Sequence, residues 1–193
     1  MNWFHRRYCA GDKWNRLVNA TLLPAAVSGV ELGDHVLELG AGPGLVTAAL
    51  ASRTTELTAV EIDPELARTA RRAVKKFPHV TVVEADATRL PFPDNHFSAV
   101  VCMTMLHHLP DPPAQDRLFG EAARVLRPGG MFCGSDNRGV GLRFHLIHLG
   151  DTKTVVPADT LAGRLRAAGF ADASVRVGSR IVFQAVAPIH QET

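Results

Sequence analysis

The chain has 193 residues, of which 46% are hydrophobic and 21% are charged, and its formal net charge is +2. This composition excludes a disordered chain, and no apolar run approaches the roughly 20 residues needed to span a bilayer. The weak positive charge does not favour a nucleic-acid partner. Because the N-terminus lacks an apolar core after its basic pair, we expect a cytoplasmic protein, and three cysteines at unrelated spacings predict reduced thiols.

The length predicts one domain over 1–193, with a helical cap at 1–35 and an α/β core at 36–193. The cap segment carries four large aromatic side chains that the core does not need: Trp3, Phe4, Tyr8 and Trp14. We expect the segment to close over a ligand as a lid, with Tyr8 and Trp14 in contact. The alternative is a helix packed on the sheet far from the site.

From Val36 onwards, short apolar runs alternate with amphipathic segments, which is typical of βαβ units and a parallel sheet. Strands are predicted at 36–40, 56–61, 80–84, 97–103, 130–135, 172–177 and 181–186. Helices are predicted at 44–52, 64–76, 114–126 and 158–168, with a short one at 142–149. Breaker residues at 127–130 end the third helix, and Gly178-Ser179 predicts an antiparallel hairpin of the last two strands.

A glycine-rich turn follows the first predicted strand, with glycines at 40, 42 and 44 and Ala41 between the first two. Glycine permits a sharp turn and leaves no side chain between the backbone and a ligand. The G-x-G-x-G spacing differs from the dinucleotide pattern G-x-G-x-x-G, and Glu38 lies two residues upstream. A carboxylate repels a pyrophosphate and attracts an ammonium group, so the pattern favours a cationic nucleoside.

A second acidic signal follows the second strand. Glu61 lies 21 positions beyond Gly40 (61 − 40), and an acid at this spacing is placed to accept both hydroxyls of a ribose. Ile62 is expected beside the same ligand. Its neighbour Asp63 precedes Pro64 and is better interpreted as a helix N-cap.

These motifs resemble those of the class I S-adenosylmethionine-dependent methyltransferases, whose first motif is an acidic residue followed by G-x-G-x-G. Residues 90–101, 106–110 and 126–130 narrow the resemblance to the type-11, small-molecule branch, over about 36–135. It implies a Rossmann-like, doubly wound, seven-stranded α/β sheet, mostly parallel with a C-terminal antiparallel hairpin. It also implies S-adenosylmethionine as the cofactor and a small-molecule acceptor.

The resemblance assigns further roles. Asp86 would accept a hydrogen bond from the adenine amino group, and the backbone N–H of Ala87 would meet the ring. Ser98 departs from the family, which commonly has aspartate there, and we expect its effect to be structural.

Methyl transfer needs an aligned nucleophile, exclusion of water and sometimes removal of a proton. We expect Glu38 near the methionine end of the cofactor, with Met103 or Thr104 lining the site after the fourth strand. His107 and His108 are the candidate catalytic proton acceptors, since histidine titrates near neutral pH. Alternatively, these histidines satisfy backbone groups in a connecting loop.

Three other features are better explained without chemistry. Asp111-Pro112-Pro113 is a helix start, Cys102 packs in the core, and His145, His148 and Asp151 lack the further ligands of a metal site. Two rival functions stay open, a nicotinamide-dependent oxidoreductase and a catalytically silent domain that binds S-adenosylmethionine. The acceptor and the oligomeric state are not predicted, because acceptor specificity lies in 1–35 and 139–157, which match no known pattern.

Overall fold

The computed structural model describes residues 11–140, 144, 146, 150 and 152–189. An N-terminal helical stretch precedes the sheet and consists of α2 (Asp12–Leu17), the π-helical η1 (Val18–Leu22) and α3 (Leu23–Ala26). The strands are β1 (His35–Leu39), β2 (Glu56–Glu61), β3 (Val80–Glu84), β4 (Phe97–Met103), β5 (Leu126–Asp136), β6 (Asp172–Val177) and β7 (Ile181–Val186). The helices between them are α4 (Leu45–Ala51), α5 (Pro64–Ala73), the 3₁₀ turn η2 (Leu106–His108), α6 (Pro112–Val125) and α8 (Ala158–Ala167).

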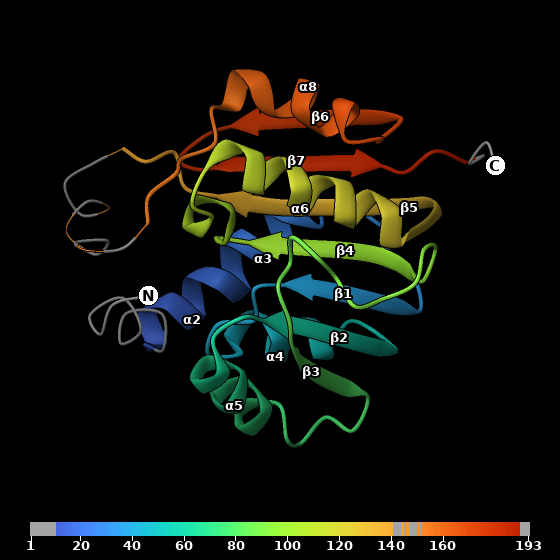
Figure 1. Ribbon diagram of the computed structural model, residues 1–193. Helices are drawn as coiled ribbons and strands as arrows, with labels where there is room; N and C mark the ends of the chain where they lie inside the picture. The colour runs from blue at the N-terminus through green and yellow to red at the C-terminus, as the bar shows by residue number, and fades with distance from the viewer. Residues whose placement is uncertain (1–10, 141–143, 145, 147–149, 151, 190–193) are drawn as a thin grey trace.

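The seven strands form one sheet in the order β3-β2-β1-β4-β5-β7-β6 (Figure 1). The pairs from β3 to β5 are parallel, and β7 pairs antiparallel with both β5 and β6. The chain order reverses between β1 and β4, which is where open α/β sheets bind ligands. The expected fold, a Rossmann-like doubly wound sheet with a C-terminal antiparallel hairpin, is confirmed.

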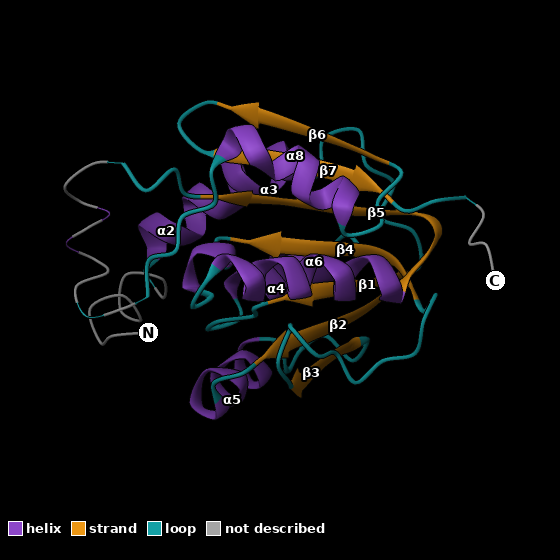
Figure 2. Ribbon diagram, turned by 45° about the horizontal axis from the view of Figure 1, so that its top comes forward, coloured by secondary structure: helices purple, strands orange, loops and turns teal. Residues whose placement is uncertain are grey.

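Successive side chains of the central strands point to opposite faces of the sheet and fill two cores. Leu37 of β1 and Val100 of β4 belong to the core under α6 and α8. Val36 and Val101, their sequence neighbours, belong to the core under α3 and α4. Figures 1 and 2 show α6 and α8 on one side of the sheet, with α3 and α4 on the other. Such two-sided burial explains why these strands read as continuous apolar runs.

The N-terminal helices belong to the second of these cores. Trp14, Val18, Leu22 and Leu23 are buried there together with side chains of β1, β4 and α4. This stretch is helical as far as Ala26, and residues 27–34 lead to β1 without further helix. Among the described residues, no helix is long and apolar enough to cross a membrane.

One strand boundary differs clearly from its prediction. The fifth strand was expected from 130, but β5 already begins at Leu126, which pairs with Phe97. The breaker residues do end α6 at Val125, yet the chain stays extended through a register shift in which Gly129 takes a φ of +74°. A proline and a glycine end a helix but are tolerated in a β-bulge. The residues that end α6 therefore do not prevent β5 from beginning at once.

Smaller differences concern helix ends. The second core helix ends at Ala73 rather than 76, and α6 begins at Pro112 rather than 114. The short helix expected at 142–149 falls mostly outside the described residues. The structural role expected for Ser98 fits its contacts, because its hydroxyl donates to the carbonyl of Leu32 and accepts from the N–H of His35.

Candidate cofactor and acceptor site

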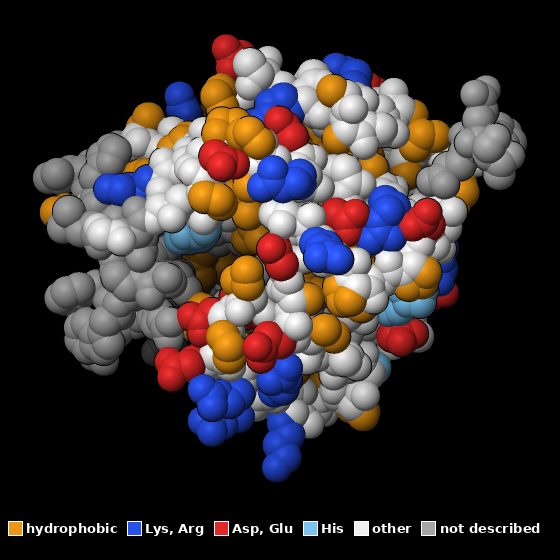
Figure 3. All heavy atoms as spheres, in the orientation of Figure 1, with side chains coloured by type: hydrophobic (Ala, Val, Ile, Leu, Met, Phe, Trp, Pro, Cys, Tyr) orange, Lys and Arg blue, Asp and Glu red, His pale blue; other side chains and the backbone are white. Residues whose placement is uncertain are grey.

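A cavity of about 640 Å³ opens at the carboxyl ends of the central parallel strands. Figure 3 shows the molecule hollowed at this end of the sheet. Nine of the twelve site residues predicted from the sequence line it: Gly40, Ala41, Gly42, Glu61, Ile62, Asp86, Ala87, Met103 and His108. The other three, Glu38, Gly44 and His107, do not line the cavity among the described residues.

The glycine turn forms one wall of the cavity. Gly40, Gly42 and Gly44 all have positive φ angles, a conformation that other residues rarely adopt. A Cβ at Gly40 would come within 2.5 Å of Cγ of Met105, and one at Gly44 within 2.9 Å of Cα of Ala70. A Cβ at Gly42 would meet nothing within 4 Å. The first and third glycines therefore permit close packing, while the backbone at Gly42 is open to a ligand.

Glu61 ends β2 and is buried against this turn. Its Oε2 accepts a hydrogen bond of 2.8 Å from the N–H of Gly42, and its Oε1 accepts one of 3.0 Å from the N–H of Asp63. A carboxylate offers about four acceptor sites, so both oxygens keep capacity for ribose hydroxyls. The Asp63 side chain accepts from the N–H groups of Glu65 and Leu66, which confirms it as the N-cap of α5.

Asp86 lies in the loop after β3. Its Oδ1 accepts from both the N–H and the hydroxyl of Thr88, each at 2.8 Å. Its other carboxylate oxygen makes no hydrogen bond with the described residues, so it can accept one from a ligand in the cavity. Asp86 lines the cavity and keeps the capacity to accept a further hydrogen bond.

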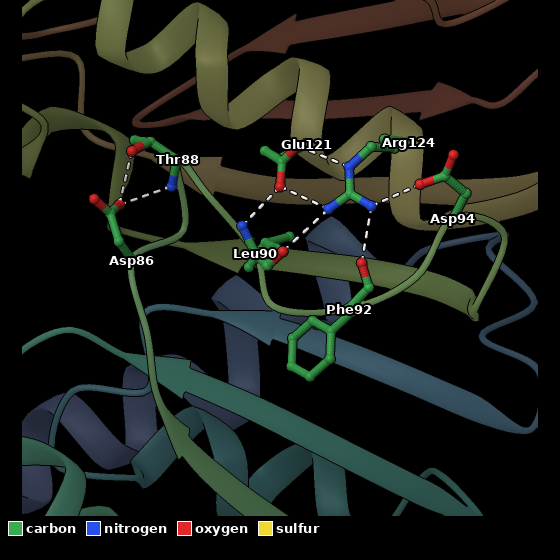
Figure 4. A network of polar contacts seen from close by, with 7 residues as sticks. All are labelled: Asp86, Thr88, Leu90, Phe92, Asp94, Glu121 and Arg124. Atoms are coloured by element: carbon green, nitrogen blue, oxygen red, sulfur yellow. Dashed lines mark hydrogen bonds and ion pairs between the residues drawn. The ribbon is translucent and has the colours of Figure 1, made fainter.

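The chain after this loop is fastened to α6, as Figure 4 shows. The guanidinium of Arg124 donates to the carbonyls of Leu90 and Phe92 and pairs with Glu121 and Asp94. Glu121 in turn accepts from the N–H of Leu90 at 2.6 Å. Helix α6 therefore holds the segment that follows Asp86.

Glu38 lies within β1, beneath the glycine turn, with a side chain that is 1% exposed. Neither carboxylate oxygen, nor the hydroxyl of Thr47 on α4, makes a hydrogen bond of ordinary geometry with the described residues. Burial raises the pKa of Glu38 to about 8, and the nearby Glu61 adds to the rise while Thr47 opposes it. With this pKa the group is mostly the neutral carboxylic acid near pH 7, and a cation bound beside it would favour the charged form.

The two histidines of η2 have different environments. Nδ1 of His107 lies 2.5 Å from Oδ1 of Asp136 at the end of β5, and both side chains are buried. Although burial opposes it, the pKa of Asp136 lies below its ordinary value, because His107, the N–H of Asn137 and Arg180 favour the carboxylate. The ring of His108 lies 4.2 Å from that of His107, centroid to centroid, and lines the cavity.

These features lie at one cavity or directly next to it. Glu61 and Asp86 keep oxygens that can accept hydrogen bonds, the backbone at Gly42 is open, and Glu38 is a buried acid in the strand that leads to the glycine turn. The donor set fits S-adenosylmethionine, and the class of protein is an α/β methyltransferase.

The comparisons with known proteins agree. The sequence profile of the family described as "Methyltransferase domain" matches residues 37–134. The chain therefore belongs to this methyltransferase family, and its cofactor is S-adenosylmethionine.

Among curated relatives, a ubiquinone biosynthesis O-methyltransferase of Xylella fastidiosa is 35% identical over 112 residues, 55% of this chain and 43% of that protein. A demethylmenaquinone methyltransferase of Tropheryma whipplei is 35% identical over 104 residues, 53% of this chain and 41% of that protein. The chain thus spans less than half the length of these relatives.

Solved structures share the fold at low identity. A putative methyltransferase of Haloferax volcanii, in complex with the Trm112 activator, has a TM-score of 0.74 and 20% identity. That match covers 97% of this chain and 99% of the other. A phosphoethanolamine N-methyltransferase 2 of Haemonchus contortus in complex with S-adenosylmethionine has a TM-score of 0.76 and 18% identity, over 96% and 56% of the two chains.

Sequence reasoning missed two features of the site. Asp136, the partner of His107, was not singled out, although an acid at the end of a predicted strand is a usable signal. The anchoring by Arg124 links residues about thirty positions apart, and no local pattern reveals such a contact. Tyr8, His145, His148 and Asp151 lie outside the described residues, whereas Trp14 lines the cavity.

Proposed function

We propose that the protein transfers a methyl group from S-adenosylmethionine to a small-molecule acceptor. The observation that carries the proposal is the convergence of the glycine turn, Glu61 and Asp86 on one cavity. When bound, the cofactor supplies an electrophilic methyl group on a sulfonium. The chain's own work is to bind the nucleoside, to hold the acceptor in line and to exclude water.

In this proposal the nucleoside spans the glycine turn. Glu61 receives the ribose hydroxyls, Asp86 receives the adenine amino group, and Ala87 meets the ring through its backbone N–H. Ile62, exposed by 65% although it lines the cavity, offers an apolar surface to the base. Ala41, Gly42 and Met103 provide walls, and Glu38 attracts the ammonium group from beneath the turn.

His108 is the group that takes a proton from the acceptor. It lines the cavity, whereas His107 is 3% exposed and engaged with Asp136. The alternative from the sequence, that the histidines satisfy backbone groups in a connecting loop, does not describe the ring of His107, which contacts the side chain of Asp136. The proposal therefore keeps one catalytic histidine.

The acceptor is a small molecule with a hydroxyl group. The Xylella fastidiosa relative is named an O-methyltransferase, which supports oxygen as the methylated atom. An acidic hydroxyl loses its proton more readily than an amide or an aliphatic alcohol, and a neutral histidine is a base of suitable strength.

A cytoplasmic location remains a prediction from the sequence.

Calorimetry with S-adenosylmethionine, S-adenosylhomocysteine and NADH tests the cofactor site. Both sulfur nucleosides are expected to bind, and NADH is not, because the glycine turn lacks the G-x-G-x-x-G spacing of dinucleotide-binding sites. Binding of NADH alone would favour the rival oxidoreductase. Turnover is then measured by release of S-adenosylhomocysteine with a panel of phenols and catechols. A protein that binds both nucleosides and methylates none of them would be the silent domain.

A further inference from the structure

Thr104, the first residue after β4, has a left-handed backbone conformation with a φ of +54°. Among the described residues, Asn95 is the other non-glycine residue with a positive φ. Asparagine adopts this conformation several-fold more often than most residues, but a β-branched residue there is an outlier. Strain of this kind costs free energy and concentrates at functional sites.

The turn that contains Thr104 is fixed from several directions. The N–H of Thr104 donates to the carbonyl of Ser135 at 2.7 Å, and the N–H of His107 donates to Asp136 at 3.2 Å. The side-chain amide of Gln115 on α6 donates to the carbonyl of Leu106 at 3.1 Å. Anchors on β5 and α6 therefore impose the turn, which is how a strained residue persists.

No hydrogen bond of the Thr104 side chain to the described residues offsets this strain. That side chain lines the cavity, and its hydroxyl makes no hydrogen bond with any of the described residues. Glycine or asparagine would satisfy the same backbone with less strain. The hydroxyl and methyl groups of Thr104 are thus available to a ligand in the cavity.

The sheet order indicates which part of a ligand Thr104 meets. Glu61 and Asp86 follow β2 and β3, which lie on one side of β1, whereas Thr104 follows β4 on the other side. The ribose and base therefore occupy the β2–β3 side. Thr104 and His108 belong to the same turn and both line the cavity on the β4 side.

We infer that Thr104 is an acceptor-binding residue, whose hydroxyl hydrogen-bonds the oxygen that is to be methylated and aligns it for attack. This role rests on the proposed function and deepens it. The hydroxyl of threonine can both donate and accept, so it can hold the acceptor oxygen before and after His108 removes the proton. The acceptor class is a compound with an ionisable hydroxyl.

Four variants separate the hydroxyl from the backbone strain. Thr104→Val keeps the β-branched shape and removes the hydroxyl, and Thr104→Ser keeps the hydroxyl. Thr104→Gly removes both the side chain and the strain. Asn95→Gly is the matched control, because it changes the other positive-φ residue, which does not line the cavity. Each is measured for thermal midpoint, affinity for S-adenosylhomocysteine, and kcat/KM with the best phenol or catechol of the panel.

The kcat/KM of Thr104→Val for the acceptor is expected to fall about tenfold, because the variant loses one hydrogen bond to the acceptor. Thr104→Ser should retain most of it, and affinity for S-adenosylhomocysteine should stay within about twofold in both. Thr104→Gly should raise the thermal midpoint by about 2–4 °C while losing activity. Asn95→Gly should change neither property to that extent.

Equal kcat/KM in Thr104→Val and the unchanged protein would overturn the inference, as would equal losses in Thr104→Val and Thr104→Ser. A Thr104→Gly protein no more stable than the parent would remove the strain on which the argument depends. If the unchanged protein binds S-adenosylhomocysteine and methylates no compound of the panel, the proposed function fails, and the role of Thr104 fails with it. If the protein binds both nucleosides and turns over an acceptor, but the Thr104 variants have the kcat/KM of the unchanged protein, only this inference is wrong and the proposed function stands.

Discussion

The carboxylate of Glu61 accepts a hydrogen bond of 2.8 Å from the backbone N–H of Gly42, and this contact joins the end of β2 to the glycine turn after β1. The two segments are parallel neighbours, with Leu39 paired to Val60. One side chain therefore fixes the backbone of the glycine turn and also lines the cavity, with acceptor capacity left on its oxygens. Replacing it should affect binding more than stability.

Glu61→Ala is expected to weaken binding of S-adenosylhomocysteine by at least about tenfold, since charge-assisted hydrogen bonds contribute about 1.5–3 kcal/mol each. Calorimetry gives the dissociation constant directly. The matched control is Asp63→Ala, which removes the N-cap of α5. That variant should lose about 1 kcal/mol of stability and keep its affinity. If Glu61→Ala bound normally and Asp63→Ala did not, the ribose role would belong to Asp63.

The central strands could be predicted because they are buried on both faces, which produces continuous apolar runs. Glu61 stood out as an acid at the end of such a run, whereas Asp86 was indicated by the resemblance to the methyltransferases, and both residues line the cavity. The predicted start of β5 was wrong, because Pro128 and Gly129 indicate the end of a helix but not whether a loop or a bulged strand follows it. Only the pairing of Leu126 with Phe97 decides between them.

The site was predicted less completely than the sheet. Residue type and spacing identified most of the predicted residues that line the cavity, but they do not distinguish His107 from His108, which are adjacent in sequence. The difference arises from Asp136, which lies 29 positions from His107 in sequence. Its carboxylate accepts from the backbone N–H of His107 and contacts Nδ1 of the His107 ring. Long-range contacts of this kind depend on the packing of β5 beside β4, and no local pattern contains them.

The buried carboxylate of Glu38 should make stability depend on pH. Its pKa is about 8 in the folded protein against an ordinary value of 4.5, so the folded state binds the proton more tightly. The stabilising contribution is fully present below pH 4.5 and is lost as the pH rises through 8. The slope between these limits is at most about 1.4 kcal/mol per pH unit.

Urea denaturation at pH 5, 6, 7 and 8 measures this dependence, with Glu38→Gln as the comparison. Glutamine is isosteric and does not titrate, so the difference between the two proteins isolates Glu38 from other groups such as His35. The free energy of unfolding should fall with pH more steeply in the unchanged protein than in Glu38→Gln. Parallel pH profiles would show that Glu38 is not protonated in the folded protein.

The two histidines of η2 should respond differently to substitution. His108→Asn is expected to lower kcat with a phenolic acceptor by about 10²–10⁴-fold, which is the usual contribution of a general base. His107→Asn should lower stability instead, because the buried carboxylate of Asp136 loses the imidazole ring that contacts its Oδ1. A normal kcat in His108→Asn at every pH would exclude it as the proton acceptor.

The N-terminal helices are proposed to respond to the ligand through Trp14. Its side chain is 8% exposed and lines the cavity, and the guanidinium of Arg180 lies 5.9 Å from the ring centroid. Other side chains of the stretch, such as Val18 and Leu22, are buried against the sheet. Residues 11–26 are therefore attached to the core and reach the cavity through Trp14, so ligand binding should order them further.

Hydrogen exchange over residues 11–22 is expected to slow when S-adenosylhomocysteine binds. The chain has two tryptophans, so a Trp3→Phe protein reports on Trp14 alone, and its fluorescence should change on titration with the ligand. Leu17→Ala, on the exposed side of α2, is the control and should leave the affinity unaltered. Trp14→Phe should weaken the affinity for S-adenosylhomocysteine. Exchange that is already slow and does not respond to ligand, together with normal affinity in Trp14→Phe, would favour a packed helix with no part in closing the site.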